Sequence, residues 1–260
     1  MTVTYSSYLK IDELLQCQQP LSDGPEHDEL LFIVIHQSYE LWFKQLLHEL
    51  DFLMRLFNDG EKYRALHTLK RIDTIYRTLI QQVDILETLT PLEFLSFRDR
   101  LSSASGFQSF QFRELEFLYG AKDAGKLDNY ETGSEHYNRL LKRLQSPTLW
   151  DAFLNFLARE GQPIPTSALQ RDLTKAAEPS TEVQQVLIDI YRRDPLVSEI
   201  CEALVDIDTS LQQWRYRHVK MVERTIGNKM GTGGSSGVGY LQGTLFNPVF
   251  PDLWAIRSEF

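Results

Sequence analysis

Apolar residues recur along this chain with the period of an α-helix, while the period-2 alternation of β-strands is almost absent. The clearest stripe lies between residues 63 and 86, where one side of a helix carries Tyr63, Leu66, Leu69, Ile72, Tyr76, Leu79, Val83 and Leu86. A stripe of this kind is expected of a long helix that packs antiparallel against a neighbouring helix. The pattern therefore predicts an all-α protein.

The N-terminal part is predicted to contain one short and one long helix. The short helix is expected around Tyr8–Cys17, and Ser22 or Asp23 is expected to cap a long helix that runs to about Asn58. Further helices are predicted at about 107–119, 134–145, 148–160 and 181–193, with a last long helix from Pro195 to about Asn228.

The sequence TPLE marks another helix start. Thr90 suits the N-cap, Pro91 suits the first helical position and Glu93 completes a capping box.

The region 161–180 contains three prolines and is the one loop-rich interruption. Because no internal repeat or domain boundary is visible, we expect residues 1–260 to form a single-domain helical bundle.

Composition and charge narrow the functional classes. With 260 residues, of which 42% are hydrophobic, the chain can bury an ordinary globular core. The formal net charge of -9 disfavours nucleic acid and anionic membrane surfaces as partners. Only two cysteines are present, which suits a reducing compartment. No secretory signal or membrane-spanning stretch is visible, so we expect a cytoplasmic protein.

Two histidines lie among apolar residues. In the stretch FIVIHQSYELWF, burial of the His36 imidazole would cost about 1–3 kcal/mol unless a partner bonds to it. His218 belongs to the apolar stripe of the last long helix, with Ile200, Leu204, Ile207, Leu211, Trp214, Met221 and Thr225. For either histidine alone, a core imidazole bonded to a backbone carbonyl is the simpler interpretation. Two of them on inward faces of long helices favour a haem site, because a helix-borne imidazole commonly holds haem iron.

Basic and glycine-rich neighbours of His218 fit this hypothesis. Arg215, Arg217, Lys220 and Arg224 flank it, either as the solvated face of the helix or as partners of haem propionates. The sequence GTGGSSG follows the helix and offers backbone N–H groups and hydroxyls that suit an anion or a zwitterion. It lacks the Gly-Lys-Ser/Thr order of a nucleotide-binding P-loop.

Other metal chemistry has little support in the sequence. The paired Glu-x-x-His of di-iron bundles and the His-Glu-x-x-His of zinc proteases are absent. His27 and Glu29 form a weak His-x-Glu match, which we interpret as helix capping and solvation. The remaining histidines have charged or polar neighbours and are expected at the surface: His48, His67 and His136.

Three long motifs carry a family likeness. The stretches HDELLFIVIHQSYELWFKQLLHELD, TPLEFLSFRDRLSSASGFQSFQFRELE and WRYRHVKMVERTIGNKMGTGGSSGVGYL resemble tryptophan 2,3-dioxygenases, and the likeness extends from Tyr5 to about Leu241. The resemblance implies a mainly helical, cytoplasmic homotetramer that binds haem b, ferrous in its active state. It implies insertion of both atoms of O2 across the indole C2–C3 bond of L-tryptophan, giving N-formyl-L-kynurenine in the first step of tryptophan degradation.

The resemblance also assigns roles to residues around the haem. His218 matches the proximal haem ligand, and His36 matches the catalytic residue that faces the indole N–H, either orienting the substrate or acting as a base. Phe32 and Phe94 match walls of the substrate pocket, and Arg98 matches the anchor of the substrate carboxylate.

Further matches lie in loops and at the N-terminus. Ser105 resembles a serine near both haem and substrate, and Thr232 resembles the residue that meets the substrate ammonium or carboxylate. Tyr5 and Tyr8 match tyrosines that reach into a neighbouring subunit's site, so residues 1–20 are expected to pack on that subunit.

Three other functions stay open from sequence alone. A related histidine-ligated haem oxygenase could act on a modified indole or another aromatic amino acid in a biosynthetic pathway. A non-catalytic haem or indole sensor would use the same pocket, although a gas sensor has no need of Arg98 as a carboxylate anchor. A helical interaction module without a cofactor would not explain why His36 and His218 both lie on inward faces of long helices.

Overall fold

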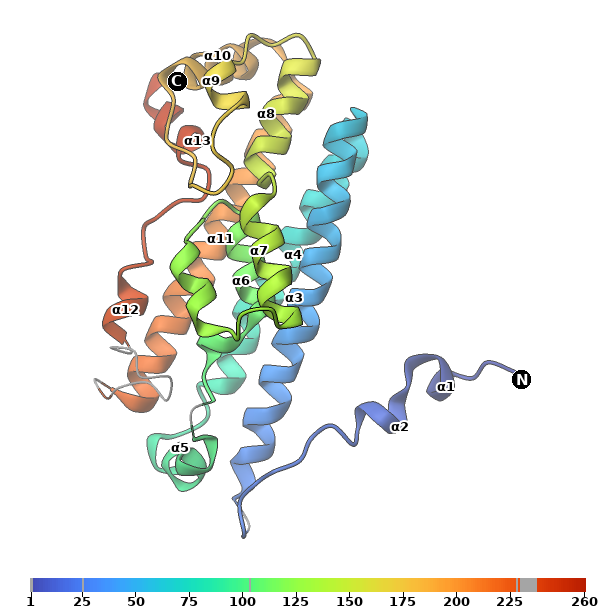
Figure 1. The fold of residues 1–260 in the computed structure, drawn as a ribbon, viewed down its shortest axis with the longest axis vertical. Helices are drawn as coiled ribbons and strands as arrows, with labels where there is room; N and C mark the ends of the chain where they lie inside the picture. The colour runs from blue at the N-terminus through green and yellow to red at the C-terminus, as the bar shows by residue number, and fades with distance from the viewer. Residues whose placement is uncertain (1, 25, 103, 228, 230–237) are drawn as a thin grey trace.

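The three longest helices form where the sequence has its longest apolar stripes, and they run side by side (Figure 1). They are α3 (His27–Asp59), α4 (Lys62–Leu86) and α11 (Pro195–Ile226), and α4 packs against both of the others. The computed structural model describes residues 2–24, 26–102, 104–227, 229 and 238–260, and these contain helices and no β-strand. The predicted all-α bundle is confirmed.

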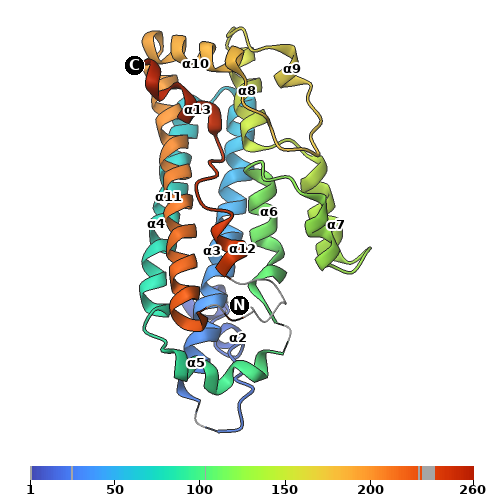
Figure 2. The same cartoon turned by 90° about the vertical axis from the view of Figure 1, so that its left-hand side faces the viewer.

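The antiparallel course of α3 and α11 places two distant parts of the sequence together. The first turns of α3 and the last turns of α11 lie at the same end of the bundle (Figure 2). His36 is in the third turn of α3 and His218 is near the end of α11, so the fold brings both histidines to that end.

The N-terminal region differs from the prediction. Instead of one helix around Tyr8–Cys17 there are two short ones, α1 (Tyr5–Leu9) and α2 (Ile11–Leu14). Between them Lys10 takes a left-handed conformation with φ 54°, which ends the first helix. In Figure 1 this segment extends away from the bundle as an arm.

The predicted cap of α3 at Ser22 or Asp23 is wrong, because the helix begins at His27 with Glu26 as its N-cap. Glu29 of the first turn is buried and accepts hydrogen bonds from the backbone N–H groups of Leu21, at 2.7 Å, and Ser22, at 3.0 Å. Its carboxylate therefore ties the arm to the helix, and the assignment of Glu29 to solvation was also wrong.

Helix α5 (Pro91–Arg98) has the capping box that the sequence predicted. Thr90 Oγ1 accepts from the Glu93 N–H, and Glu93 Oε2 accepts from the Thr90 N–H. The next helix, α6 (Phe110–Leu118), begins three residues later than predicted, because residues 106–108 form a 3₁₀ turn.

The C-terminal half completes the bundle. Helices α7 (Glu135–Gln145), α8 (Leu149–Arg159) and α10 (Thr181–Arg193) match their predicted ranges closely. Within the loop-rich region, α9 (Thr166–Leu169) forms a single turn. After α11 come two short helices that the sequence did not predict, α12 (Val238–Gln242) and α13 (Pro251–Ala255). The segment that joins them runs back along α11, as Figure 2 shows.

Candidate functional site

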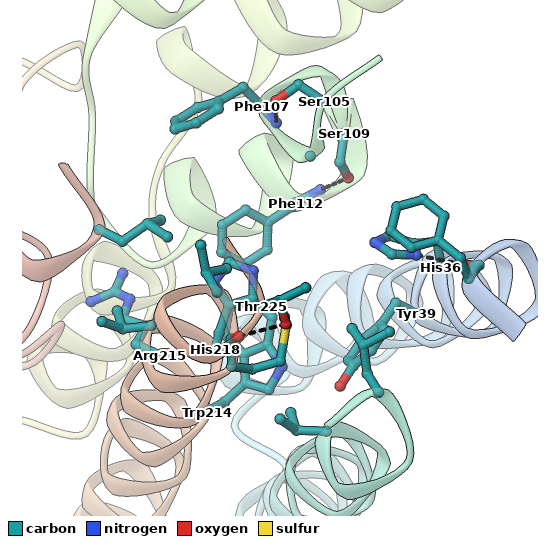
Figure 3. Close-up of a pocket in the computed structure, with 18 of the residues that line it drawn as sticks. His36, Tyr39, Ser105, Phe107, Ser109, Phe112, Trp214, Arg215, His218 and Thr225 are labelled. Carbon is teal, nitrogen blue, oxygen red and sulfur yellow. Dashed lines mark hydrogen bonds between the residues drawn. The ribbon is translucent and has the colours of Figure 1, made fainter. Parts of the chain in front are cut away.

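A cavity of about 290 Å³ opens at the end of the bundle where α3 begins and α11 ends. Helices α3, α4, α5, α6 and α11 all contribute to its walls, which are mostly apolar. Six of the residues predicted to form the site line this cavity: Phe32, His36, Phe94, Arg98, Ser105 and His218. Figure 3 shows His36 on one side of it and the residues of α11 on another.

The imidazole of His36 faces the cavity and is exposed there, so its expected burial within an apolar core was wrong. Its Nδ1 lies 2.7 Å from the carbonyl oxygen of Phe32, one turn earlier in α3. A carbonyl can only accept, so Nδ1 carries the proton and donates it. Although the ring is exposed to the cavity, desolvation by the surrounding protein lowers the pKa of His36, and the bond to Phe32 opposes this effect. The neutral ring therefore keeps an unprotonated Nε2.

His218 lies on the apolar stripe of α11, half-buried against the cavity. Its ring stacks on Trp214, one turn earlier, with centroids 5.3 Å apart and planes 7° from parallel. Burial lowers the pKa of His218 to about 4, and the nearby His36 adds to this effect. The imidazole is therefore neutral at pH 7, which is the form that binds a metal.

Aromatic rings pack beside His36. The centroid of Phe32 lies 4.1 Å from that of His36 and 5.8 Å from that of Phe94, which is buried in α5. Arg98 ends α5 and is half-buried at the cavity. Ser105 caps the following 3₁₀ turn by accepting from the Phe107 N–H at 3.3 Å. Its hydroxyl proton remains able to donate.

The basic residues near His218 divide into two groups. Arg217 pairs with carboxylates on α4 and just beyond it, and Lys220 pairs with Glu223 on its own helix. Arg215 is different, because it is buried and lines the cavity. The solvated-face interpretation therefore fits Arg217, Lys220 and the exposed Arg224, and it fails for Arg215.

Two of the predicted site residues that the structure describes do not line this cavity. Tyr5 and Tyr8 lie on the N-terminal arm, where 76% and 77% of their surface is exposed. Thr232 lies outside the described residues.

The other histidines lie at the surface, as predicted: His27, His48, His67 and His136. Within the described ranges no cluster of three or more His, Cys, Asp or Glu side chains could hold a bare metal ion. No helix in that same part of the chain is long and apolar enough to span a membrane.

Sequence comparison decides the family. The family model for tryptophan 2,3-dioxygenase matches residues 1–160 and 181–260. The chain belongs to the tryptophan 2,3-dioxygenase family. The resemblance identified from the three motifs is thereby confirmed, and membership makes the chain an oxidoreductase of the dioxygenase class.

Curated tryptophan 2,3-dioxygenases match this chain over nearly its whole length. The protein of Herpetosiphon aurantiacus is 56% identical over 257 residues, covering 99% of this chain and 98% of its own. The protein of Anaeromyxobacter sp. strain K is 52% identical and covers 98% of this chain and 96% of its own. That of Caulobacter vibrioides is 45% identical and covers 99% of this chain and 98% of its own. The family model leaves out residues 161–180, the loop-rich region that contains three prolines.

Sequence reasoning missed several residues of this dioxygenase cavity. Arg113 and Glu116 of α6 form a buried ion pair in its wall, and Lys126 joins Glu116 at 3.1 Å. Phe107 packs against Arg113, whose guanidinium carbon lies 5.4 Å from the ring centroid. The signal available was the run of charges in FRELEFLYG, but charge on a helix is usually solvated and nothing in the run indicated burial.

Proposed function

We propose that this chain is a haem-dependent tryptophan 2,3-dioxygenase that inserts both atoms of O2 across the indole C2–C3 bond of L-tryptophan, giving N-formyl-L-kynurenine. One observation supports this most directly. In a chain of this family, two neutral imidazoles, His36 on α3 and His218 on α11, face one mostly apolar cavity that Arg98 also lines.

The residues present fit a haem b group. His218 offers a neutral imidazole, and no hydrogen bond to either of its nitrogens comes from the described residues. The walls near it are apolar side chains such as Val219, Met221 and Val222, which suit a porphyrin face. In this proposal His218 is the proximal ligand, and the ferrous haem supplies the iron at which O2 is activated.

His36 orients the substrate. Because its Nδ1 proton is committed to the Phe32 carbonyl, the free Nε2 can accept only one hydrogen bond, from a donor in the cavity. The indole N–H of tryptophan is such a donor. This bond fixes the position of the indole ring and supplies the proximity contribution to catalysis. The lowered pKa makes the His36 imidazole a weak base, so it would hold the indole proton only transiently. We therefore assign His36 the role of orienting the substrate.

The other side chains bind the rest of the amino acid. Phe32 and Phe94 flank the indole, and Arg98 pairs with the carboxylate through the two parallel bonds that a guanidinium can donate. Ser105 lies on the 3₁₀ turn at the cavity and can donate to a polar group there. Thr232 is assigned to the ammonium or carboxylate on the family likeness alone.

We also propose that the enzyme is a cytoplasmic homotetramer in which residues 1–20 pack on a neighbouring subunit. The arm exposes apolar side chains that would be costly in water, Val3 and Leu15 besides the two tyrosines Tyr5 and Tyr8. A second copy of the chain would cover them.

Purified ferrous protein mixed with O2 and L-tryptophan tests the function. A product heavier than tryptophan by two oxygen atoms, both from O2 when labelled oxygen is used, is expected. A product with one added oxygen would point to the related oxygenase on a modified aromatic substrate. A haem Soret band without turnover would point to a sensor and would refute the proposal.

A further inference from the structure

A second cavity, of about 260 Å³, lies next to the first along α11. Its walls come from the end of α6, the start of α8, residues 176–178 and the segment that joins α12 to α13. Figure 2 shows this segment running along α11 on its way back from α12. Glu116, Arg215 and Thr244 line both cavities, so the two share one wall.

Arg215 is the unusual group in that wall. Its side chain is only 9% exposed, and no carboxylate oxygen of the described residues lies within 4.0 Å of it. Its Nη1 donates two long hydrogen bonds, at 3.4 Å to the Thr244 carbonyl and at 3.3 Å to the Asn247 carbonyl. Figure 3 shows the side chain extending away from the His36 side of the first cavity.

Three acidic residues line the second cavity: Glu178 is exposed, while Glu116 and Asp252 are bonded to other partners. Glu116 pairs with Arg113 and Lys126. Asp252 accepts at 2.8 Å from the Ser180 N–H and at 2.9 Å from Gln184 Nε2. A buried guanidinium without a counter-ion carries a large desolvation cost that an anion would remove. The positive charge of Arg215 is therefore left for a group that enters the cavity.

The rest of the lining restricts what that group can be. Trp150, Tyr119, Val249 and Pro251 give the cavity aromatic and aliphatic walls, and both aromatic side chains are buried. Arg215 carries one buried positive charge, and a guanidinium binds a carboxylate through two parallel hydrogen bonds. The volume is near the lower end for ligand pockets, which suits a molecule of about ten non-hydrogen atoms.

We propose that the second cavity is a binding site for a small monocarboxylate with an apolar body, whose carboxylate pairs with Arg215. The site is separate from the space between His36 and His218, and it does not depend on the reaction proposed above. The carboxylate could belong to an amino acid or to a simple organic acid, and the two share this recognition chemistry.

Fluorine NMR titration of the haem-containing protein with para-fluorobenzoate tests the site. Ala177 lines the second cavity and not the first, so Ala177→Phe fills it while leaving Arg215 and the first cavity in place. We expect Ala177→Phe and Arg215→Met each to weaken binding at least tenfold. Arg217→Met, which removes an arginine already paired with Asp84, is the matched control and is expected to bind as the wild type does.

Competition separates the two sources of carboxylate. Displacement of the probe from the Ala177-sensitive site by L-leucine, which has nine non-hydrogen atoms, assigns the site to amino acids. Displacement by acetate but not by L-leucine assigns it to simple organic acids. Either result supports the site. Unchanged probe binding in Ala177→Phe would overturn the proposal whether or not the protein oxidises tryptophan. Loss of haem from Arg215→Met would also overturn it, because the cation would then serve the cofactor.

Discussion

Asp208 holds the C-terminal segment against α11, and we predict that Asp208→Asn loosens this segment and destabilises the protein by about 3 kcal/mol. The carboxylate is fully buried. Its Oδ2 accepts from the Val249 N–H at 2.9 Å, the Phe250 N–H at 3.1 Å and Trp254 Nε1 at 2.9 Å. A hydrogen bond to a charged group contributes about 1.5–3 kcal/mol, and a neutral one about 0.5–1.5 kcal/mol. Losing the charge therefore costs about 1 kcal/mol for each of the three bonds.

The measurement is urea unfolding followed by circular dichroism, together with limited proteolysis of the C-terminal end. Asp206→Asn is the control, since Asp206 lies on the same helix with an exposed side chain and its substitution is expected to cost less than about 0.5 kcal/mol. We expect Asp208→Asn to unfold at a clearly lower urea concentration and to be cleaved faster near residue 250.

Equal unfolding midpoints in the two variants would refute the reasoning. They would mean that the three donors find water or other acceptors when the segment relaxes. Asp208→Leu is then a second test, because it leaves all three donors without an acceptor. Each unsatisfied donor is expected to cost about 1–3 kcal/mol of stability. If even this variant were as stable as Asp206→Asn, the carboxylate would have no role in holding the segment.

Three further predictions concern the site and the arm. His218→Ala is expected to lose tightly bound haem, while His36→Ala keeps it; equal haem-to-protein ratios after purification would remove His218 from the proximal role. Arg98→Leu is expected to weaken L-tryptophan binding by about 2–5 kcal/mol if the charge pair is desolvated, with tryptamine, which lacks the carboxylate, little affected; an equal loss for both contradicts the anchor. For Glu29, burial raises the pKa, but the hydrogen bonds from Leu21 and its neighbour outweigh this and lower it. Its contribution is therefore present above the normal carboxyl pKa and is lost as pH falls through the lowered value. Proteolysis of the arm should accelerate over that range, and Glu29→Ala should remove this dependence.

The sequence by itself determined the helical elements and the family. The stripe from Tyr63 to Leu86 predicted α4, and the TPLE signal predicted the start of α5, because both depend on interactions between residues only a few positions apart. The inward position of His218 followed from the same period. Boundaries were missed where the determining contact is distant, as at the start of α3, where Glu29 bonds the backbone of Leu21 and Ser22.

Only the tertiary structure decided how the charged residues are used. Arg215 and Arg217 lie two positions apart in one basic run, yet Arg217 reaches Asp84 beyond the helix and Arg215 turns into a buried wall. The exposure of His36 to a cavity, in place of burial in the core, likewise depends on α5 and α11 leaving space in front of it. Local periodicity fixes which side of a helix a residue occupies. Whether that side meets a packed neighbour, a counter-ion or a cavity is set by elements that are far away in the sequence.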